Sequence, residues 1–433
     1  MVGGLSRALD LTEGQPVGHA QRTVVIGMRI AKLLDVSESE QADLFYALLL
    51  KDAGCSASAS RTAAIFDADD IALRADAKLV NFRQTRETLA YITRSANHDG
   101  GRIRRLRTAI GVAKAFKVGA QAIVAERCAQ GAEIVSAIGL SPAAADTVAS
   151  LEEHWDGGGL PRGIAGDQIP LLARIGAIAQ CIDVFNQRRG RDEARAMVRA
   201  RRGVAFDPRL ADLVLARSDD DEIWATTAAR ELAAVVASLE PPSAVIAATD
   251  DRLDQVAKGF ALVIDAKSPW TRHHSQGVAE IANSAATLVG MPADIRSDFR
   301  RAALLHDIGK LAVPSQILDK QAALTSVEFA QVKLHAKIGE DIIAGIPPFA
   351  KWASTIGEHH ERLDGTGYPR GLTDQNLSPA ARLLAVADVY DALTAARPYR
   401  AAKSRDEAIA LLESQLHTGF CPEAFDAVRA ATV

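Results

Sequence analysis

The chain contains one pattern twice, and this internal repeat limits what it can fold into more than any other feature. Residues 5–23 align with residues 260–278 at an offset of 255, which places His19 on His274. A repeat of this length is typical of a duplicated domain, so we expect two copies of one fold in the chain.

Two further pairs of segments keep the same order. KDAGC at 51–55 falls on HDIGK at 306–310, and EEHWDGGGLPRG at 152–163 aligns with HERLDGTGYPRG at 360–371. The offset is 255 for the first pair and 208 for the second, so the first copy carries 47 extra residues. We place them in the polar stretch between about Phe66 and Phe116.

The chain of 433 residues is too long for one hydrophobic core, since cores stop growing near roughly 250–300 residues. Acidic and proline-containing segments, SDDDE and LEPPSA, flank an alanine-rich stretch between the copies. We therefore expect one domain at 1–217, a connector at 218–251 and a second domain at 252–433.

Helix signals occur along the whole chain. Thr325 with Glu328 forms a capping box, and Ser378 followed by Pro379 is a good start for the helix ARLLAVADVYDALT. No segment alternates apolar and polar residues between hairpin turns. The prediction is an all-α fold of two tandem helical bundles joined by a helical connector.

Composition excludes several classes of protein. The net charge of −4 gives no long-range attraction to nucleic acid or anionic lipid, and no apolar run reaches the roughly 18 residues of a membrane span. The four cysteines form no CxxC pair, which argues against a disulfide framework and a thiolate zinc site. We expect a cytoplasmic protein that binds neither nucleic acid nor membrane.

Six of the ten histidines lie between residues 273 and 360. With nearby acids they give seven candidate metal ligands: His274, His306, Asp307, His335, His359, His360 and Asp388. Imidazole and carboxylate without thiolate suit Fe, Mn, Co, Ni or Zn. Seven ligands are too many for one ion, whereas two ions with Asp307 as a bridge use the whole set.

The motifs in the second copy together resemble the HD-GYP family, a branch of the HD phosphohydrolases. They are HDIGK, HHERLDGTGYP, ADVYDALT and RPYR, and the resemblance runs from Asp265 to about Arg429. Members of this family hydrolyse cyclic di-GMP at a centre of two or three metal ions, giving pGpG or GMP. The resemblance implies two HD-type bundles, of which the first is degenerate.

The resemblance also implies roles for individual residues. It makes the seven candidates metal ligands, with Fe or Mn favoured over Co, Ni or Zn. It implies that Asp307 and Lys310 are catalytic and that the substrate is bound by Lys310, Tyr368, Arg397 and Arg400. Two divalent ions a few ångström apart convert a bridging water to hydroxide near neutral pH, so no side-chain base is required.

One position departs from the family pattern. Three-metal members have a glutamate four residues before the first histidine of the site, and this chain has Trp270 there. An indole cannot bind a metal, so a two-metal centre is expected. The product, pGpG or GMP, stays open.

The first copy keeps only His19 and Asp52 of the seven ligand positions. The others hold Lys51, Arg127, Leu151, Glu152 and Gln180, and DGTGYP has become DGGGLP. Positive charge there would repel a metal cation and accept an anion. The first copy is then a regulatory or dimerising pseudo-domain, or a structural remnant.

Three functions follow, in order of preference. The first is a metal-dependent phosphodiesterase that hydrolyses cyclic di-GMP to pGpG, or on to GMP. The second is an HD phosphohydrolase for another cyclic nucleotide or dinucleotide, because no motif reads guanine directly. The third is a non-catalytic signalling adaptor. A homodimer or a signalling protein partner is compatible with each.

Overall fold

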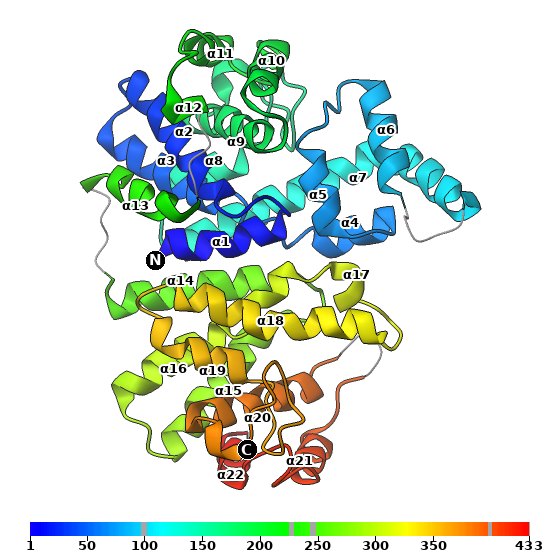
Figure 1. The fold of residues 1–433 in the computed structure, drawn as a ribbon, viewed down its shortest axis with the longest axis vertical. Coiled ribbons are helices and arrows are strands. Elements are labelled where there is room, and N and C mark those ends of the chain that lie inside the picture. The colour runs from blue at the N-terminus through cyan, green and yellow to red at the C-terminus, as the bar shows by residue number, and fades with distance from the viewer. Residues whose placement is uncertain (97–101, 225–228, 243–247, 397–400, 433) are drawn as a thin grey trace. The chain divides into compact units, whose positions relative to one another are not determined.

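The structure is a computed structural model that describes residues 1–96, 102–224, 229–242, 248–396 and 401–432 (Figure 1). Across these ranges it consists of helices and isolated bridges, without a strand, which confirms the all-α prediction. Within the same ranges, no helix combines the length and the apolar composition needed to cross a bilayer.

The chain divides into two compact units. The first unit comprises Leu9–Ala248 with Val2, and the second comprises Thr249–Val433 with Met1 and Gly3–Ala8. Helix α1 (Val2–Thr12) contains residues of both groups. Each unit is described by itself below.

The first unit contains twelve further helices in the described residues. They are α2 (His19–Leu33), α3 (Glu38–Leu50), α4 (Ala59–Phe66), α5 (Asp70–Ala77), α6 (Thr85–Ser95), α7 (Arg102–Ala137), α8 (Pro142–Ala149), α9 (Leu171–Arg189), α10 (Arg191–Arg201), α11 (Pro208–Leu215), α12 (Asp221–Trp224) and α13 (Ala229–Leu239). Helix α2 packs against both α3 and α9, and its buried face carries Val24, Ile26 and Ile30.

The segment 218–251, expected to be a connector, is largely part of the first unit. Helices α12 and α13 both pack against α2. Ile223, Trp224, Leu232 and Val236 are buried in the core of this unit, and burial of such side chains stabilises by about 1.5–3 kcal/mol each. The chain therefore leaves the first unit near Ala248 rather than at residue 217.

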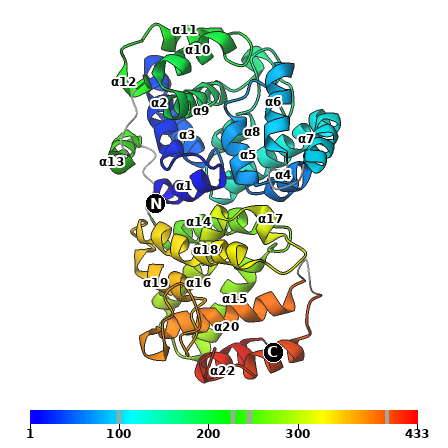
Figure 2. The same cartoon turned by 45° about the vertical axis from the view of Figure 1, so that its right-hand side comes forward.

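The extra residues of the first copy form helices of their own. Helices α5, α6 and the beginning of α7 lie together with α4 (Figures 1 and 2). They enclose a small separate core that includes Phe66, Leu73, Tyr91 and Val112. This polar stretch is thus a folded insertion.

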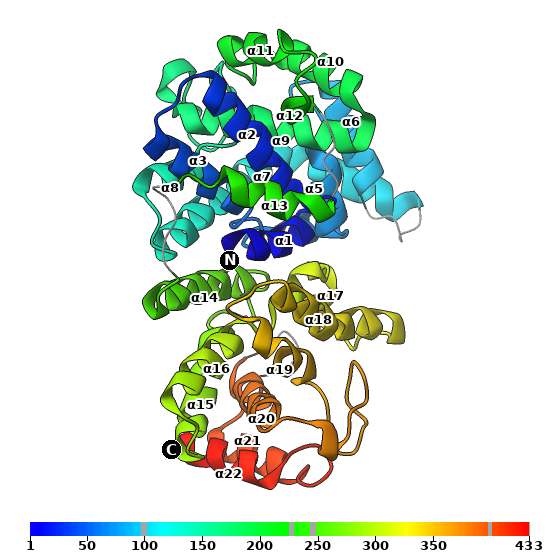
Figure 3. The same cartoon turned by 60° about the vertical axis from the view of Figure 1, so that its left-hand side comes forward.

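The second unit contains nine helices in the described residues. They are α14 (Asp250–Asp265), α15 (His274–Leu288), α16 (Ala293–Leu305), α17 (Ser315–Leu318), α18 (Ser326–Ala344), α19 (Ala353–Glu358), α20 (Pro379–Thr394), α21 (Arg405–Glu413) and α22 (Pro422–Ala431). Helix α20 is central and packs against α15, α19 and α22 (Figure 3). A 3₁₀ turn over Ile308–Ala312 packs against α18.

Two helix starts follow the sequence signals. Thr325 Oγ1 accepts a hydrogen bond from the Glu328 amide at 3.2 Å, and Glu328 Oε2 accepts one from the Thr325 amide at 2.7 Å. Ser378 Oγ caps α20 by accepting from the Ala381 amide at 3.1 Å. Both predicted helix starts are confirmed.

The same close contact between a helix and a turn occurs in both units. A Cβ on Gly309 would collide with the carbonyl oxygen of His335, and a Cβ on Gly54 would collide with that of Arg127. Glycine at these positions lets one helix lie directly on the turn that carries the buried aspartate. The same contact in both units pairs Arg127 with His335, as the offset of 208 predicts.

Candidate metal centre

The seven candidate ligands meet in the second unit. They come from the start of α15 (His274), the turn after α16 (His306 and Asp307), the middle of α18 (His335), the turn after α19 (His359 and His360) and α20 (Asp388). All are buried except His360, which is partly exposed.

Their donor atoms form three close groups, of which two share no residue and the third, His306, Asp307 and His359, connects these two. His335, His359 and His360, here called the histidine triad, have donor atoms within 4.8 Å of one another. His274, His306 and Asp388, here called the mixed triad, are equally close. Each triad supplies three donors, the number that protein side chains commonly give to one catalytic ion.

Asp307 lies between the two triads. Its Oδ2 is 3.6 Å from His274 Nε2 and 3.4 Å from His306 Nε2, both in the mixed triad. Its Oδ1 is 3.4 Å from His335 Nε2 and 3.9 Å from His359 Nε2, both in the histidine triad. One carboxylate oxygen thus faces each triad, as a bridging ligand requires.

The backbone fixes which ring nitrogen of each histidine faces the centre. The Nδ1 atoms of His306, His335 and His359 lie 2.5–2.7 Å from the carbonyl oxygens three residues earlier. A neutral imidazole that donates from Nδ1 keeps a lone pair on Nε2. The helices therefore aim the Nε2 atoms of all three rings inward. Burial lowers the pKa of His306, but Asp307 and Asp388 outweigh burial and raise that pKa to about 10, so this ring is protonated without a metal ion.

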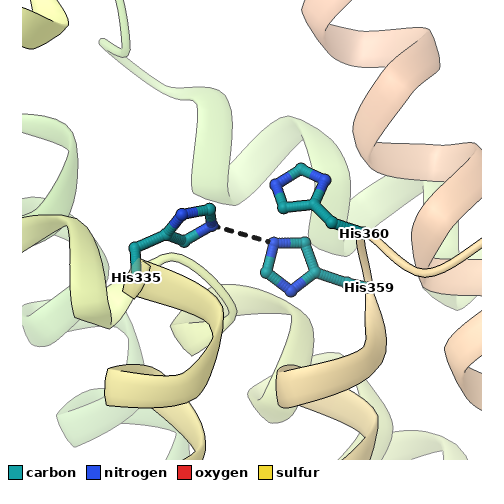
Figure 4. A group of neighbouring side chains, drawn as sticks. All are labelled: His335, His359 and His360. Atoms are coloured by element: carbon teal, nitrogen blue, oxygen red, sulfur yellow. Dashed lines mark hydrogen bonds between the residues drawn. The ribbon is translucent and has the colours of Figure 1, made fainter. Parts of the chain in front are cut away.

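Two of these Nε2 atoms face each other. His335 Nε2 and His359 Nε2 are 3.3 Å apart (Figure 4). Burial lowers the pKa of His335 to about 4 and is also the main cause that lowers the pKa of His359 to about 3. Both rings are neutral at pH 7 and donate from Nδ1, so neither Nε2 carries a proton, and a bound cation would satisfy both nitrogens.

Other buried atoms in the centre also lack protein partners. His306 Nε2 and Asp307 Oδ1 have no hydrogen bond in the described part of the chain. Leaving buried polar atoms unsatisfied costs about 1–3 kcal/mol each. The donor set, the aimed lone pairs and these unsatisfied atoms fit divalent metal ions.

The predicted substrate contacts are only partly described. Lys310 Nζ donates to Asp307 Oδ2 at 2.5 Å, and the Tyr368 ring lies 4.8 Å from the His360 ring at an angle of 36°. Arg397 and Arg400 lie outside the described residues. Trp270 precedes α15 in a turn, so its position is not part of a helix.

Asp391 is a residue of the centre that the sequence did not reveal. Its Oδ2 lies 2.5 Å from His274 Nδ1, so His274 turns Nε2 toward Asp388 Oδ1, at 3.1 Å. Asp391 follows Asp388 by three residues on α20, which is the spacing of one helix face. The spacing of three residues could have indicated Asp391, but exposed acidic residues on a helix often have the same spacing.

The model of a protein family described as "HD domain" matches residues 118–210 and 260–421, which together make up more than half of the chain. The second range contains the whole centre and the DGTGYP turn. The chain belongs to the HD-GYP branch of the HD domain family. The HD-GYP protein is a phosphodiesterase, the enzyme class predicted from its sequence.

Named relatives of this HD-GYP protein have two kinds of substrate. 3′3′-cGAMP-specific phosphodiesterase 3 of Vibrio cholerae is 39% identical over 427 residues, covering 99% of this chain and 93% of that protein. The cyclic di-GMP phosphodiesterase response regulator RpfG of Xanthomonas campestris is 35% identical over 181 residues, covering 41% of this chain and 48% of that protein.

A solved structure resembles the HD-GYP protein over both copies. It is the crystal structure of a cyclic GMP-AMP specific phosphodiesterase of V. cholerae. Its TM-score is 0.65 at 35% identity, and the superposition covers 100% of this chain and 96% of that one.

In the first copy of the HD-GYP protein, lysines stand where the centre would be. Asp52 pairs with the adjacent Lys51, and Lys78 Nζ lies 3.2 Å from Asp52 Oδ1 and 3.1 Å from Glu13 Oε2. Arg127 pairs with Glu152 at 2.7 Å. The charges of Lys51 and Arg127, which the sequence analysis offered to an anion, are thus paired internally, and Lys78 of the insertion adds a third paired cation.

We expect Asp391→Asn to weaken metal binding by about 10- to 100-fold, since it removes the acceptor that orients His274. The measurement is the metal affinity of the purified chain, by competition with a chromophoric chelator. The matched control is Asp183→Asn, because Asp183 Oδ2 accepts from His19 Nδ1 at 2.7 Å in the first copy. Equal metal affinity in Asp391→Asn and wild type would contradict the assignment.

A second prediction concerns acid stability. Burial raises the pKa of Glu13, but Lys78, Arg127 and Arg74 outweigh it and lower that pKa from 4.5 to about 2. A carboxyl with a lowered folded pKa stabilises the fold above its unfolded pKa, and this contribution is lost as pH falls through the folded pKa. The free energy of unfolding of the first unit should therefore fall from pH 4.5 towards pH 2.

Fluorescence of Trp155 and Trp224 during urea unfolding measures this, in a chain with Trp270→Phe and Trp352→Phe. The fall should be shallower in Glu13→Gln, while Glu133→Gln, at an exposed site, should keep the wild-type slope. An identical slope in Glu13→Gln would show that the ion pair with Lys78 is not important for stability.

Proposed function

We propose that the chain is a metal-dependent phosphodiesterase that opens a 3′3′-cyclic dinucleotide, and that 3′3′-cGAMP is its preferred substrate. The proposed reaction rests on the buried centre, in which two ligand triads face opposite oxygens of Asp307. Similarity over almost the whole chain to a 3′3′-cGAMP-specific phosphodiesterase supports the substrate.

This proposal revises the order of substrates expected from sequence, which began with cyclic di-GMP. The relative RpfG, named for cyclic di-GMP, matches 41% of the chain, whereas the cGAMP-specific relative also matches the degenerate copy. Cyclic di-GMP is the second candidate, because it shares a guanine nucleotide and both phosphodiester bonds with 3′3′-cGAMP.

We further propose two metal ions per chain, Fe or Mn, with Co, Ni and Zn as alternatives. One would be held by the histidine triad and one by the mixed triad, with Asp307 contributing to both. Such ions, when bound, acidify water and stabilise the charge on a phosphodiester and its leaving oxygen. The ligand numbers favour two ions over three.

The protein's own residues orient this centre and the substrate. Asp391 holds His274 in one tautomer, and the Lys310 ammonium holds Asp307 Oδ2. Lys310 is 19% exposed, so it can also donate to a phosphate oxygen of the substrate. Tyr368 lies beside His360, and we propose Arg397 and Arg400 as phosphate contacts from the sequence motif alone.

The adaptor hypothesis is disfavoured by burial. A surface that binds a partner protein needs accessible side chains, whereas His274, His306, His335 and His359 are at most 3% exposed. Imidazoles and ionised carboxylates kept from water are costly to a fold and are typical of a metal-dependent active site.

The test uses the full chain loaded with Mn²⁺ or Fe²⁺ and incubated with 3′3′-cGAMP or cyclic di-GMP, with products separated by chromatography. We expect linear dinucleotides from both, and faster turnover of 3′3′-cGAMP. Asp307→Asn should lower turnover by more than about 100-fold. Loss of a residue that only supports a metal ligand already costs up to about 100-fold, and Asp307 is proposed as a direct ligand.

Asp406→Asn, at a carboxylate that is 93% exposed, is the control and should keep wild-type turnover. Failure of the folded, metal-loaded chain to open either dinucleotide would contradict the proposed function. Wild-type turnover in Asp307→Asn would contradict the assigned centre.

A further inference from the structure

A hollow of about 410 Å³ opens beside the metal centre in the second unit. This volume is within the roughly 300–1,000 Å³ of small-molecule sites. Its lining residues come from α18, the DGTGYP loop and the turn after α21, and they include His360 of the histidine triad and Tyr368. The hollow therefore starts at the proposed reaction centre. We call it the base hollow.

One wall of the base hollow is aromatic. Phe329 on α18 is 45% exposed, and its ring stands edge-on to Tyr368, with centroids 6.1 Å apart at 82°. Lys333, one turn further along α18, places Nζ 5.2 Å from the centre of the Phe329 ring. Nucleobases stack on exposed aromatic rings of this kind, independently of base identity.

Another part of the lining presents a positioned guanidinium. Arg362 Nη1 donates to Gln415 Oε1 at 2.8 Å, and its Cζ lies 4.6 Å from the centre of the Phe420 ring. A Cβ on Gly419 would collide with Arg362, so glycine leaves the space that the side chain occupies. Arg362 is thus held in one orientation at the edge of the hollow.

The charged residues that line the hollow are two cations, Arg362 and Lys333, and one acid, Asp364. In the described part of the chain, neither Arg362 nor Lys333 has an ion-pair partner within 4.0 Å. The acid in the lining, Asp364, uses Oδ1 to accept from the Thr366 amide at 2.9 Å and hydroxyl at 2.6 Å. A ligand with hydrogen-bond acceptor atoms therefore fits beside Arg362 and Lys333.

A guanine base has such acceptors. Its O6 and N7 lie on one edge and take paired hydrogen bonds from arginine, whereas adenine presents an amino group beside N7. A guanidinium fixed by Gln415 and Phe420 therefore favours guanine over adenine.

The first copy provides an internal comparison. The offset of 208 places Gln121, Ala125, His154 and Leu160 at the positions of Phe329, Lys333, Arg362 and Tyr368, respectively. The aromatic wall and the guanidinium therefore occur in the copy that has seven ligands and not in the copy that has two. Their loss together links the base hollow to the reaction rather than to the fold.

We propose that the base hollow binds a guanine base of the cyclic dinucleotide substrate, with Arg362 as the specificity-determining residue and Phe329 as the stacking surface. Arg362 donates to guanine O6 and N7, and Lys333 offsets the charge of the phosphate next to that base. This inference rests on the proposed function.

The test compares kcat/KM for 3′3′-cGAMP, for 3′3′-cyclic di-AMP and for bis(p-nitrophenyl) phosphate, which has no nucleobase. In Arg362→Met, the ratio of 3′3′-cGAMP to bis(p-nitrophenyl) phosphate activity should fall about tenfold or more, mainly through KM, and the preference over cyclic di-AMP should shrink. Arg362→Lys should recover part of the preference. Lys337→Met is the control, since Lys337 is on α18 but pairs with Asp341 outside the hollow.

Arg362→Met also removes the packing of Arg362 on Phe420, so its effect could be structural. Phe329→Ala is an independent variant, because the Phe329 ring is 45% exposed. It should lower the same ratio through KM. Wild-type ratios in Arg362→Met or in Phe329→Ala would overturn the inference while leaving the proposed function intact. A wild-type chain that cleaves bis(p-nitrophenyl) phosphate but no cyclic dinucleotide would overturn the proposed function instead.

Discussion

The compensation of one buried carboxylate, Asp307, is the constraint on which the second unit depends. A carboxylate that is 1% exposed is costly unless cations or donors surround it. Helices α15 and α18 and the turns after α16 and α19 converge so that histidine nitrogens lie within 3.9 Å of both its oxygens. The same convergence produces two ligand triads, so the electrostatic requirement of the fold and the chemistry of the site have one origin.

The first copy meets the same constraint in another way. Asp52, at the position of Asp307, is 4% exposed and is compensated by Lys51 and Lys78. Burial raises the pKa of Asp52, but these two ammonium groups outweigh burial and hold that pKa well below its usual range. Lysine charge takes the place that metal charge is proposed to take in the second copy. The first copy can therefore keep the HD-type bundle while its chemistry is lost.

Much of this was predictable from sequence because it is encoded locally. The repeat, the helix starts at Thr325 and Ser378, and the set of candidate ligands all depend on short motifs with fixed spacing. What escaped prediction depends on distant contacts: the partner of Asp391 lies 117 residues away, and Lys78 reaches Asp52 across 26 residues. The alanine-rich stretch after residue 217 resembled a connector because its few large side chains, such as Trp224, gave no sign that α2 would bury them.

The central claim is that Asp307 joins two ligand triads into a centre for two metal ions, all of it in the second unit. The most direct measurement is the metal content of the Mn- or Fe-loaded full chain after gel filtration, by mass spectrometry of the metal with protein quantified by amino-acid analysis. Two ions per wild-type chain and at most one in Asp307→Ala are expected. Three tightly held ions, or two ions in both proteins, would contradict the account.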